Sequence, residues 1–174
     1  MKNKSMEVRL NDEVLDLIGG RKSLQLATLS PEGHPYASYA PFAIGEECLY
    51  VLLSDIALHA VNLRHHPQAS VLIIEDEDSA TELFARKRVN YSVKAELLEY
   101  QSEAWLQGME SLAGRHGERS RNLGEHSDFK MFRLKPERGR YVKGFGRAYD
   151  LEGETLAGES LVHLRDGHQQ RAVV

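Results

Sequence analysis

The chain has 174 residues with a formal net charge of −4 at pH 7, and 28% of its residues are charged, as is typical of a soluble globular protein. This length suits a single domain with its own hydrophobic core, and the acidic balance argues against bulk nucleic-acid binding. No apolar run is long enough for a membrane-spanning helix, and the single Cys48 excludes an internal disulfide. Because no signal peptide is recognisable at the N-terminus, we expect a reducing, cytoplasmic location.

The first third of the chain predicts a short helix followed by strands. Residues 11–20 place apolar side chains on one helical face and end at two glycines. Residues 23–29 and 34–43 read as two strands on either side of a Ser-Pro-Glu-Gly turn, which predicts a hairpin. Residues 48–53 are almost entirely apolar, which is typical of a strand buried on both faces.

The middle of the chain predicts a second helix and two more strands. Residues 55–66 begin beside Ser54 and Asp55, which can cap a helix, and stop before a proline. Residues 69–74 predict a second buried strand. Residues 83–97 alternate between apolar and polar side chains, which predicts a long strand with one wet face.

A basic run lies inside this long predicted strand. Strand alternation sends Arg86 and Arg88 to one face, about 7 Å apart, and Lys87 to the other. Two guanidinium groups at that spacing form a fork for phosphate or carboxylate groups. The alternative is a solvated strand face paired with the acidic turn at residues 75–78. Both interpretations stay open.

The last third predicts a helix over residues 101–116, a polar irregular segment over 117–127, and strands over 129–134 and 140–151. Two glycines interrupt the second of these strands, where the backbone can bulge or approach another segment closely. Many strands joined mostly by hairpins, with a few helices, predict an antiparallel β-barrel that carries helices.

Histidines are frequent in this chain, and two of the eight flank a turn signal near the C-terminus: His163 and His168. Neutral imidazole is a common ligand of metals and of haem iron, and a terminal loop can bring a ligand to a cofactor. A frayed polar tail is the alternative. The histidines of the predicted helix 55–66 lack the i, i+4 spacing of metal-binding pairs, and no phosphate-loop or dinucleotide-binding motif is present.

Eight short strings follow one another along the chain in the order found in a known family. They are SLQLAT (23–28), SYAPF (38–42), LHAVNL with the following HHP (58–67), VLIIEDE (71–77), LFARKR (83–88), DFKMFRL (128–134), YVKGFGRAY (141–149) and HLRDGH (163–168). Together they resemble the haem-utilisation family known as HutZ or HugZ, which belongs to the pyridoxamine-phosphate-oxidase-like split barrels. The resemblance implies a mainly β fold, an FMN-binding-type split β-barrel, and a homodimer with haem between the protomers.

The resemblance also implies roles for single residues. His168 takes the position of the axial ligand of haem iron, on a C-terminal loop at about residues 152–174 of a single domain, 1–174. Asp128 takes the position of the carboxylate that holds the other imidazole nitrogen and so fixes the orientation of the ring.

The remaining implied positions concern the cofactor's anionic groups and the subunit interface. Arg88, together with Arg86 and Lys87, falls where split barrels of this kind meet flavin phosphate or haem propionates. Ser23 and His59 fall near the family's subunit interface.

Three functions are compatible with these residues. The first is a haem-binding enzyme that opens the porphyrin ring with dioxygen and an external electron donor and releases iron; Tyr39, Phe42 and Phe145 would form part of its apolar slot. The second is an FMN-dependent oxidoreductase that uses the same barrel and basic strand. The third is a haem carrier or store without turnover, since haem binding does not prove catalysis.

Overall fold

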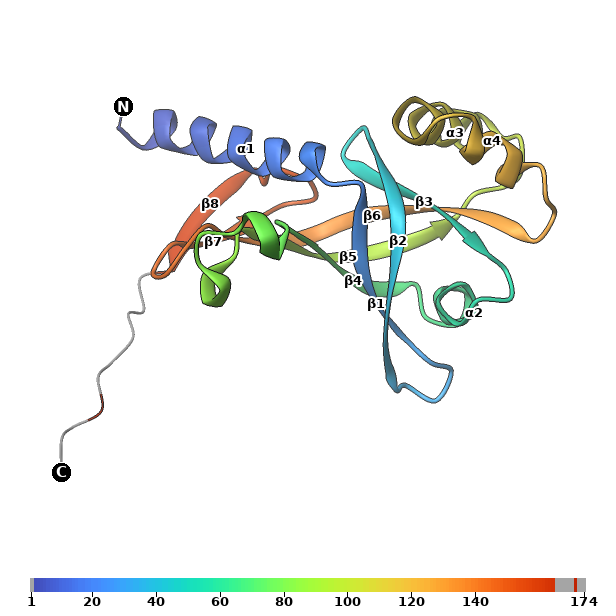
Figure 1. The fold of residues 1–174 in the computed structure, drawn as a ribbon, viewed down its shortest axis with the longest axis horizontal. Helices are drawn as coiled ribbons and strands as arrows, with labels where there is room; N and C mark the ends of the chain where they lie inside the picture. The colour runs from blue at the N-terminus through green and yellow to red at the C-terminus, as the bar shows by residue number, and fades with distance from the viewer. Residues whose placement is uncertain (1, 165–170, 172–174) are drawn as a thin grey trace.

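The computed structural model describes residues 2–164 and Arg171. It contains an antiparallel sheet in the order β3-β2-β1-β4-β5-β6-β7-β8, and an additional pairing between β3 and β6 closes the first six strands into a barrel (Figure 1). The strands are β1 (Ser23–Leu29), β2 (Pro35–Gly45), β3 (Cys48–Ser54), β4 (Gln68–Ile74), β5 (Arg88–Leu97), β6 (Phe129–Val142), β7 (Ala148–Glu152) and β8 (Ser160–Leu164).

Strand β6 is long enough to serve both the barrel and an extension beyond it. Its first six residues pair with β3, its last four pair with β7, and β5 lies along nearly its whole length. The register between β5 and β6 shifts at Ser92/Val93, opposite Pro136, which has no N–H to donate to the ladder. The hairpin β7–β8 therefore continues the sheet past the point where the barrel closes.

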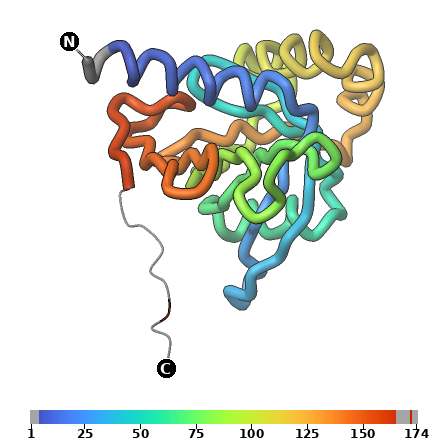
Figure 2. Tube along the Cα trace, turned by 60° about the vertical axis from the view of Figure 1, so that its left-hand side comes forward, coloured from blue at the N-terminus to red at the C-terminus, as the bar shows by residue number. Residues whose placement is uncertain are grey.

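The helices cover different parts of this sheet. Helix α1 (Lys2–Gly20) places Leu10, Val14 and Ile18 in the main core and runs beside β8 (Figures 1 and 2). Helix α2 (Leu58–His65) packs against β1. Helices α3 (Glu103–His116) and α4 (Glu118–Gly124) lie on the outside of the barrel. No helix among the described residues is both long and apolar enough to cross a membrane.

Two hydrophobic clusters follow from the strand alternation. On β5, Val89, Tyr91, Val93 and Ala95 point into the main core, as their parity in the sequence predicts. A second cluster forms between the outer face of the barrel and the α3–α4 hairpin. Its larger members are Tyr50, Trp105, Met109, Leu112 and Met131.

Several predicted boundaries were wrong, each for a local reason. Helix α1 begins nine residues before the predicted start because its first two turns are rich in strong helix formers, although residues 5–9 are mostly exposed. Residues 117–127 are not irregular throughout, since α4 follows the left-handed Gly117 (φ 78°) directly. The two strands predicted over 129–134 and 140–151 are instead the continuous β6 and the separate β7.

The predicted long strand 83–97 was also wrong in its first part. Residues Leu83–Ala85 form a 3-10 turn, η2, which begins when the Glu82 side chain accepts a hydrogen bond from the Phe84 N–H at 2.9 Å. Such local side-chain-to-backbone bonds offer the chain an alternative to the strand ladder. A second 3-10 turn, η1 (Glu77–Ser79), follows β4, so the connection between β4 and β5 contains two tight turns.

Arg115 on α3 joins three separate elements. Its guanidinium donates to the carbonyls of Ile18 and Gly19 at 3.0 Å and also to the carbonyl of Arg21, and it lies over the ring of Phe42. The last carbonyls of a helix have no partner within the helix, so this contact caps the C-terminal end of α1. The clamp therefore fixes α1 and α3 to β2.

We expect Arg115→Ala to lower the free energy of unfolding by about 2 kcal/mol, because hydrogen bonds from a charged donor are lost and helix carbonyls are left unpaired. Urea denaturation followed by circular dichroism measures this change. The matched control is Arg119→Ala, an exposed arginine on α4. Equal midpoints for the two variants would contradict the assignment of a clamp.

Candidate functional site

A row of side chains crosses the outer face of the sheet at the level of Arg88. Strand pairing places Arg88 between Ile74 and Val142, and continues the row through Ala148 to Leu164. On the other side, the β1–β4 ladder ends at Gln25 and Leu72, and its register, which the Arg21–Asp76 ion pair continues, places Ser23 near Ile74; Ser23 also pairs with Pro41. We call these seven residues the Arg88 row: Pro41, Ser23, Ile74, Arg88, Val142, Ala148 and Leu164.

The Arg88 row is mostly apolar but carries two polar groups. Its neighbours Leu24, Val89 and Tyr141 point into the core, so by alternation the row faces outward. Ser23 and Arg88 lie two strands apart, about 10 Å at the usual strand spacing. The structure thus brings together two of the predicted site residues, a hydroxyl and a guanidinium, on a strip of apolar side chains.

Arg86 and Lys87 do not alternate across the sheet as predicted, because both residues precede β5, which begins at Arg88. Arg86 precedes β5, and its guanidinium donates from Nε (3.1 Å) and from Nη2 to the carbonyl of Glu75. The Lys87 N–H donates to the Glu75 carboxylate at 2.8 Å. Of the two interpretations left open, these contacts support the pairing of the basic run with the acidic turn at residues 75–78 rather than the fork of Arg86 and Arg88, because Glu75 engages the Arg86 guanidinium. Arg88 itself donates from Nη1 to the Arg86 carbonyl at 3.0 Å.

Asp128 and His59 lie at another end of the molecule, where α2 begins. The Asp55 N–H donates to the carbonyl of Asp128 at 2.5 Å, and the Asp128 side chain is exposed. Asp55 does not cap α2 as predicted; its carboxylate pairs with Arg64 at 2.6 Å. The Nδ1 atom of His59 lies 3.0 Å from the hydroxyl of Ser38 on β2, and burial lowers the pKa of this imidazole.

Arg88 and Asp128 are separated by the length of β6. Arg88 pairs with Val142, the last residue of β6, whereas Asp128 immediately precedes Phe129, the first. Fourteen residues of strand span roughly 40 Å, and barrel curvature shortens this path only in part. One chain therefore cannot place both side chains against a single small ligand.

The predicted iron ligand, His168, lies outside the described residues. The described chain reaches Leu164, which ends β8 in the Arg88 row, four residues before His168. His163 faces the other side of β8, where it stacks on Tyr149 with 4.8 Å between ring centroids. Within residues 2–164, no three His, Cys, Asp or Glu side chains gather as a metal site.

The assignment of one residue, Phe42, to the predicted apolar slot was wrong. Phe42 is fully buried in the barrel core and under Arg115, so no ligand reaches it. Tyr39 and Phe145 are largely exposed. The sequence alone did not identify the apolar residues of the Arg88 row, although each of them lies at an outward-facing position of its own strand. Strand alternation marks each of these residues as outward-facing, but only the order of the strands in the sheet shows that the residues are neighbours.

The comparisons with known proteins agree with this architecture. The family model "Pyridoxamine 5'-phosphate oxidase" matches residues 10–143. "Heme oxygenase HutZ" of Vibrio cholerae is 44% identical over 170 residues, which cover 98% of this chain and 96% of that protein. The chain belongs to the HutZ/HugZ family of pyridoxamine 5'-phosphate oxidase-like split barrels. The resemblance seen in the eight sequence strings and the predicted split-barrel fold are thus confirmed.

Solved structures of HutZ/HugZ-type proteins have the same fold. The crystal structure of HutZ from Vibrio cholerae, there called a heme storage protein, is 42% identical with a TM-score of 0.74 and covers 78% of this chain and 96% of its own. Campylobacter jejuni ChuZ is 30% identical with a TM-score of 0.81, covering 93% of this chain and 65% of that one. The names given to HutZ thus differ between oxygenase and storage protein.

The His59 site predicts a dependence of stability on pH. Burial lowers the imidazole pKa in the folded chain below its unfolded value of about 6.5, so the folded state binds fewer protons. This contribution is fully present above pH 6.5 and is lost as pH falls through the lowered pKa. We expect His59→Gln to flatten the fall in unfolding free energy below pH 6.5, as measured by urea titrations. The control His34→Gln, in an exposed turn, should show the same pH dependence of unfolding free energy as the wild type. Parallel curves of unfolding free energy against pH for all three proteins would refute the role of His59.

Proposed function

We propose that two copies of this chain bind haem between them and open its ring oxidatively, releasing iron, with dioxygen and an external electron donor as co-reactants. The observation that carries the proposal is the 44% identity to a protein named heme oxygenase HutZ over nearly the whole of both chains. The Arabidopsis thaliana protein named non-canonical heme oxygenase HOZ is 27% identical and supports it more weakly, since the match covers 43% of that protein.

The chemistry of the Arg88 row fits haem. A porphyrin presents a flat apolar ring and two carboxylate groups, and the row offers apolar side chains beside one guanidinium and one hydroxyl. Guanidinium groups bind carboxylates with directed, charge-assisted hydrogen bonds. In this proposal Arg88 holds an anionic group of the ligand, and Ile74 and Val142 contact its ring.

His168 is proposed as the ligand of the iron. Four residues of extended chain reach at most about 14 Å, so His168 can approach the Arg88 row from Leu164 at its end. A neutral imidazole binds haem iron through one nitrogen and leaves the other for a hydrogen bond. The bound haem supplies the redox-active iron and is itself the ring that is opened.

Asp128 is proposed to accept that hydrogen bond from His168 of a second copy. The two ends of β6 keep Asp128 away from the Arg88 row of its own chain, so only another protomer can supply this carboxylate. The carboxylate would hold the proton on Nδ1 and keep Nε2 free for the iron. Asp128 is thus a positioning residue, and a homodimer is required for a complete site.

FMN binding is the second candidate, favoured by the match to the pyridoxamine 5'-phosphate oxidase model, which includes Arg86, Lys87 and Arg88. The engagement of the Arg86 guanidinium by the Glu75 carbonyl weighs against a phosphate cradle at this turn. A haem store without turnover is the third, in line with the description of crystallised HutZ as a heme storage protein.

Absorption spectra separate these functions. We expect the protein to give a Soret band with added haem, and to lose it when reductant and air are supplied. His168→Ala should weaken haem binding about tenfold or more and stop that loss, whereas His34→Ala, in an exposed turn, should behave as the wild type.

Other spectra would contradict the proposal. Uptake of FMN but not haem would refute it, and tight haem binding without loss of the band for any donor would make the protein a carrier. An unchanged spectrum in His168→Ala would move the ligand assignment to His163 or His126.

A further inference from the structure

A pocket of about 510 Å³ lies outside the barrel, between the α3–α4 hairpin and the ends of β5 and β6. None of Ser23, His59, Arg86, Lys87, Arg88 and Asp128 lines it, but His126, the alternative iron ligand named above, does, as do Ser127 and Phe129, the neighbours of Asp128. Its floor is apolar, formed by Leu98 and the fully buried Met131. Its volume is in the range of pockets that take small organic ligands.

Aromatic side chains from two connections line this pocket. Tyr100 and Trp105, from the β5–α3 side, meet edge to face with 4.9 Å between ring centroids. His126 and Phe129, from the α4–β6 side, are 6.5 Å apart between centroids. Tyr100 is 57% exposed, so most of its ring is open to a ligand. Aromatic rings of this kind favour stacked or edge-on contacts with another planar ring.

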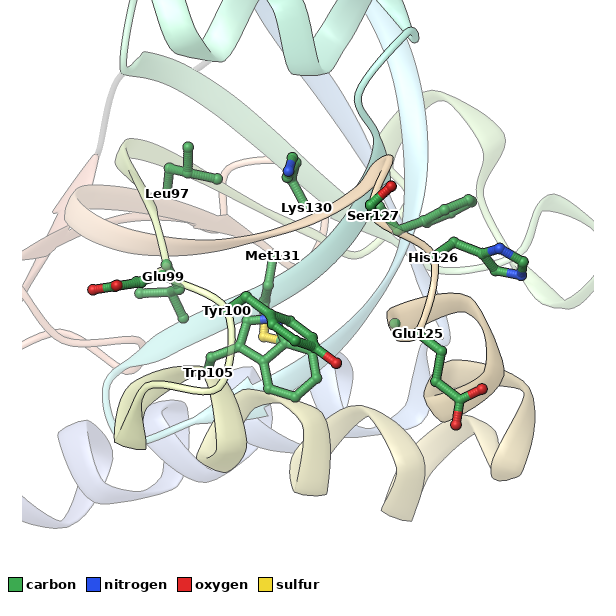
Figure 3. Close-up of a pocket in the computed structure, with 12 residues that line it drawn as sticks. Leu97, Glu99, Tyr100, Trp105, Glu125, His126, Ser127, Lys130 and Met131 are labelled. Carbon is green, nitrogen blue, oxygen red and sulfur yellow. The ribbon is translucent and has the colours of Figure 1, made fainter.

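The lining carries charges of both signs, from Glu99, Glu125 and Lys130, together with the imidazole of His126, two hydroxyls and one indole N–H, a mixture without the excess of one sign that would select a charged ligand. The hydroxyls of Tyr100 and Ser127 and the indole N–H of Trp105 can bind a carbonyl or ring nitrogen. Figure 3 shows the carboxylates of Glu99 and Glu125 pointing away from Tyr100 and Trp105. Charges thus stand at the rim, and the centre of the pocket remains apolar.

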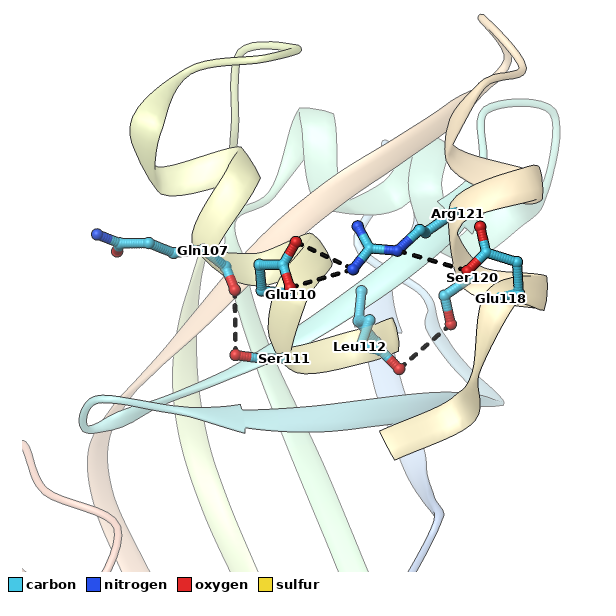
Figure 4. A network of polar contacts seen from close by, with 7 residues as sticks. All are labelled: Gln107, Glu110, Ser111, Leu112, Glu118, Ser120 and Arg121. Carbon is cyan, nitrogen blue, oxygen red and sulfur yellow. Dashed lines mark hydrogen bonds and ion pairs between the residues drawn. The ribbon is translucent and has the colours of Figure 1, made fainter. Parts of the chain in front are cut away.

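The α3–α4 wall of the pocket is held by its own polar network (Figure 4). Arg121 on α4 binds both oxygens of Glu110 on α3, at 3.0 and 3.1 Å, and the Ser120 hydroxyl donates to the Leu112 carbonyl at 3.3 Å. At Gly124 a Cβ would overlap Met109 Cε and lie 3.4 Å from Trp105, so glycine permits the end of α4 to approach the indole. The pocket is therefore formed before any ligand arrives.

We propose that this pocket binds an uncharged, planar, conjugated ring molecule that carries a carbonyl or ring-nitrogen acceptor, at a site separate from the Arg88 row. The ring stacks on the open face of Tyr100 and lies beside Trp105, and its acceptor faces the hydroxyl and indole donors. The pocket contains no residue of the Arg88 row, although Ser127 and Phe129 flank Asp128, and the inference itself makes no use of haem binding.

The sole tryptophan of the chain lines this pocket, so its fluorescence reports occupancy directly. The probe is lumichrome, a neutral tricyclic ring with carbonyl groups, titrated into the full-length protein without added haem. We expect saturable quenching of Trp105 emission at micromolar probe. Tyr100→Ala should weaken the affinity about tenfold, whereas Tyr36→Ala, at the β1–β2 hairpin and outside the pocket, should not change it.

Two further measurements test whether this pocket is distinct from the haem site and selective for planar rings. We expect Arg88→Ala to bind lumichrome within twofold of the wild type, and camphor, a carbonyl compound without a planar ring, not to displace lumichrome. Linear, non-saturating quenching or equal affinity in Tyr100→Ala would overturn the proposal. A joint loss of haem and lumichrome binding in Arg88→Ala would overturn the separateness of the sites, and failure of haem binding alone would leave this inference standing.

Discussion

The structure depends on the dual pairing of β6, a fourteen-residue strand that belongs to the barrel at one end and to the β7–β8 extension at the other. Its first part closes the barrel against β3, and without that ladder both strands would present unpaired backbone groups. Its last part carries the sheet outward, where α1 covers the inner side with Leu10, Val14 and Ile18. A single strand thus sets the closure of the barrel and the place from which the C-terminal segment departs.

The same strand decides how a site can be assembled. Arg88 and the end of β8 lie at the level of Val142, and Asp128 lies before Phe129, so the groups that the family resemblance joins are held apart in one chain. The residues of the Arg88 row are half-buried or exposed, so the row is partly accessible along the sheet. A ligand bound there meets the opposite end of β6 only when a second copy provides it, which makes dimerisation part of the proposed chemistry. The aromatic pocket beside α3 is formed within one chain and has no such requirement.

Sequence patterns predicted the parts of this molecule that depend on local alternation. The inward residues of β5 and the bounds of β1 follow from their own periodicity. The conformation of residues 83–87 could not be predicted from alternation. The carboxylates of Glu82 and Glu75 accept hydrogen bonds from nearby backbone N–H groups, and the Glu75 carbonyl accepts one from the Arg86 side chain, so the strand does not continue through this segment.

The Arg88 row could not be predicted from the sequence either, because Ile74, Val142 and Ala148 become neighbours only through the order of the strands in the sheet. The pocket beside Trp105 likewise needs the position of the α3–α4 hairpin against β6, which no local pattern specifies. His168 and Asp128 remain predictions from the resemblance.

The central claim is that each haem site takes Arg88 from one copy and Asp128 from the other, and a mixed dimer tests it most directly. Arg88→Ala and Asp128→Asn chains, each with a different affinity tag, would be co-expressed and the hybrid isolated by both tags. Each parent protein should degrade haem slowly. The hybrid retains one site with both native residues if the site spans two chains, so we predict about half of the wild-type rate. A hybrid as slow as its parents would show that each site lies within a single chain and would contradict the account.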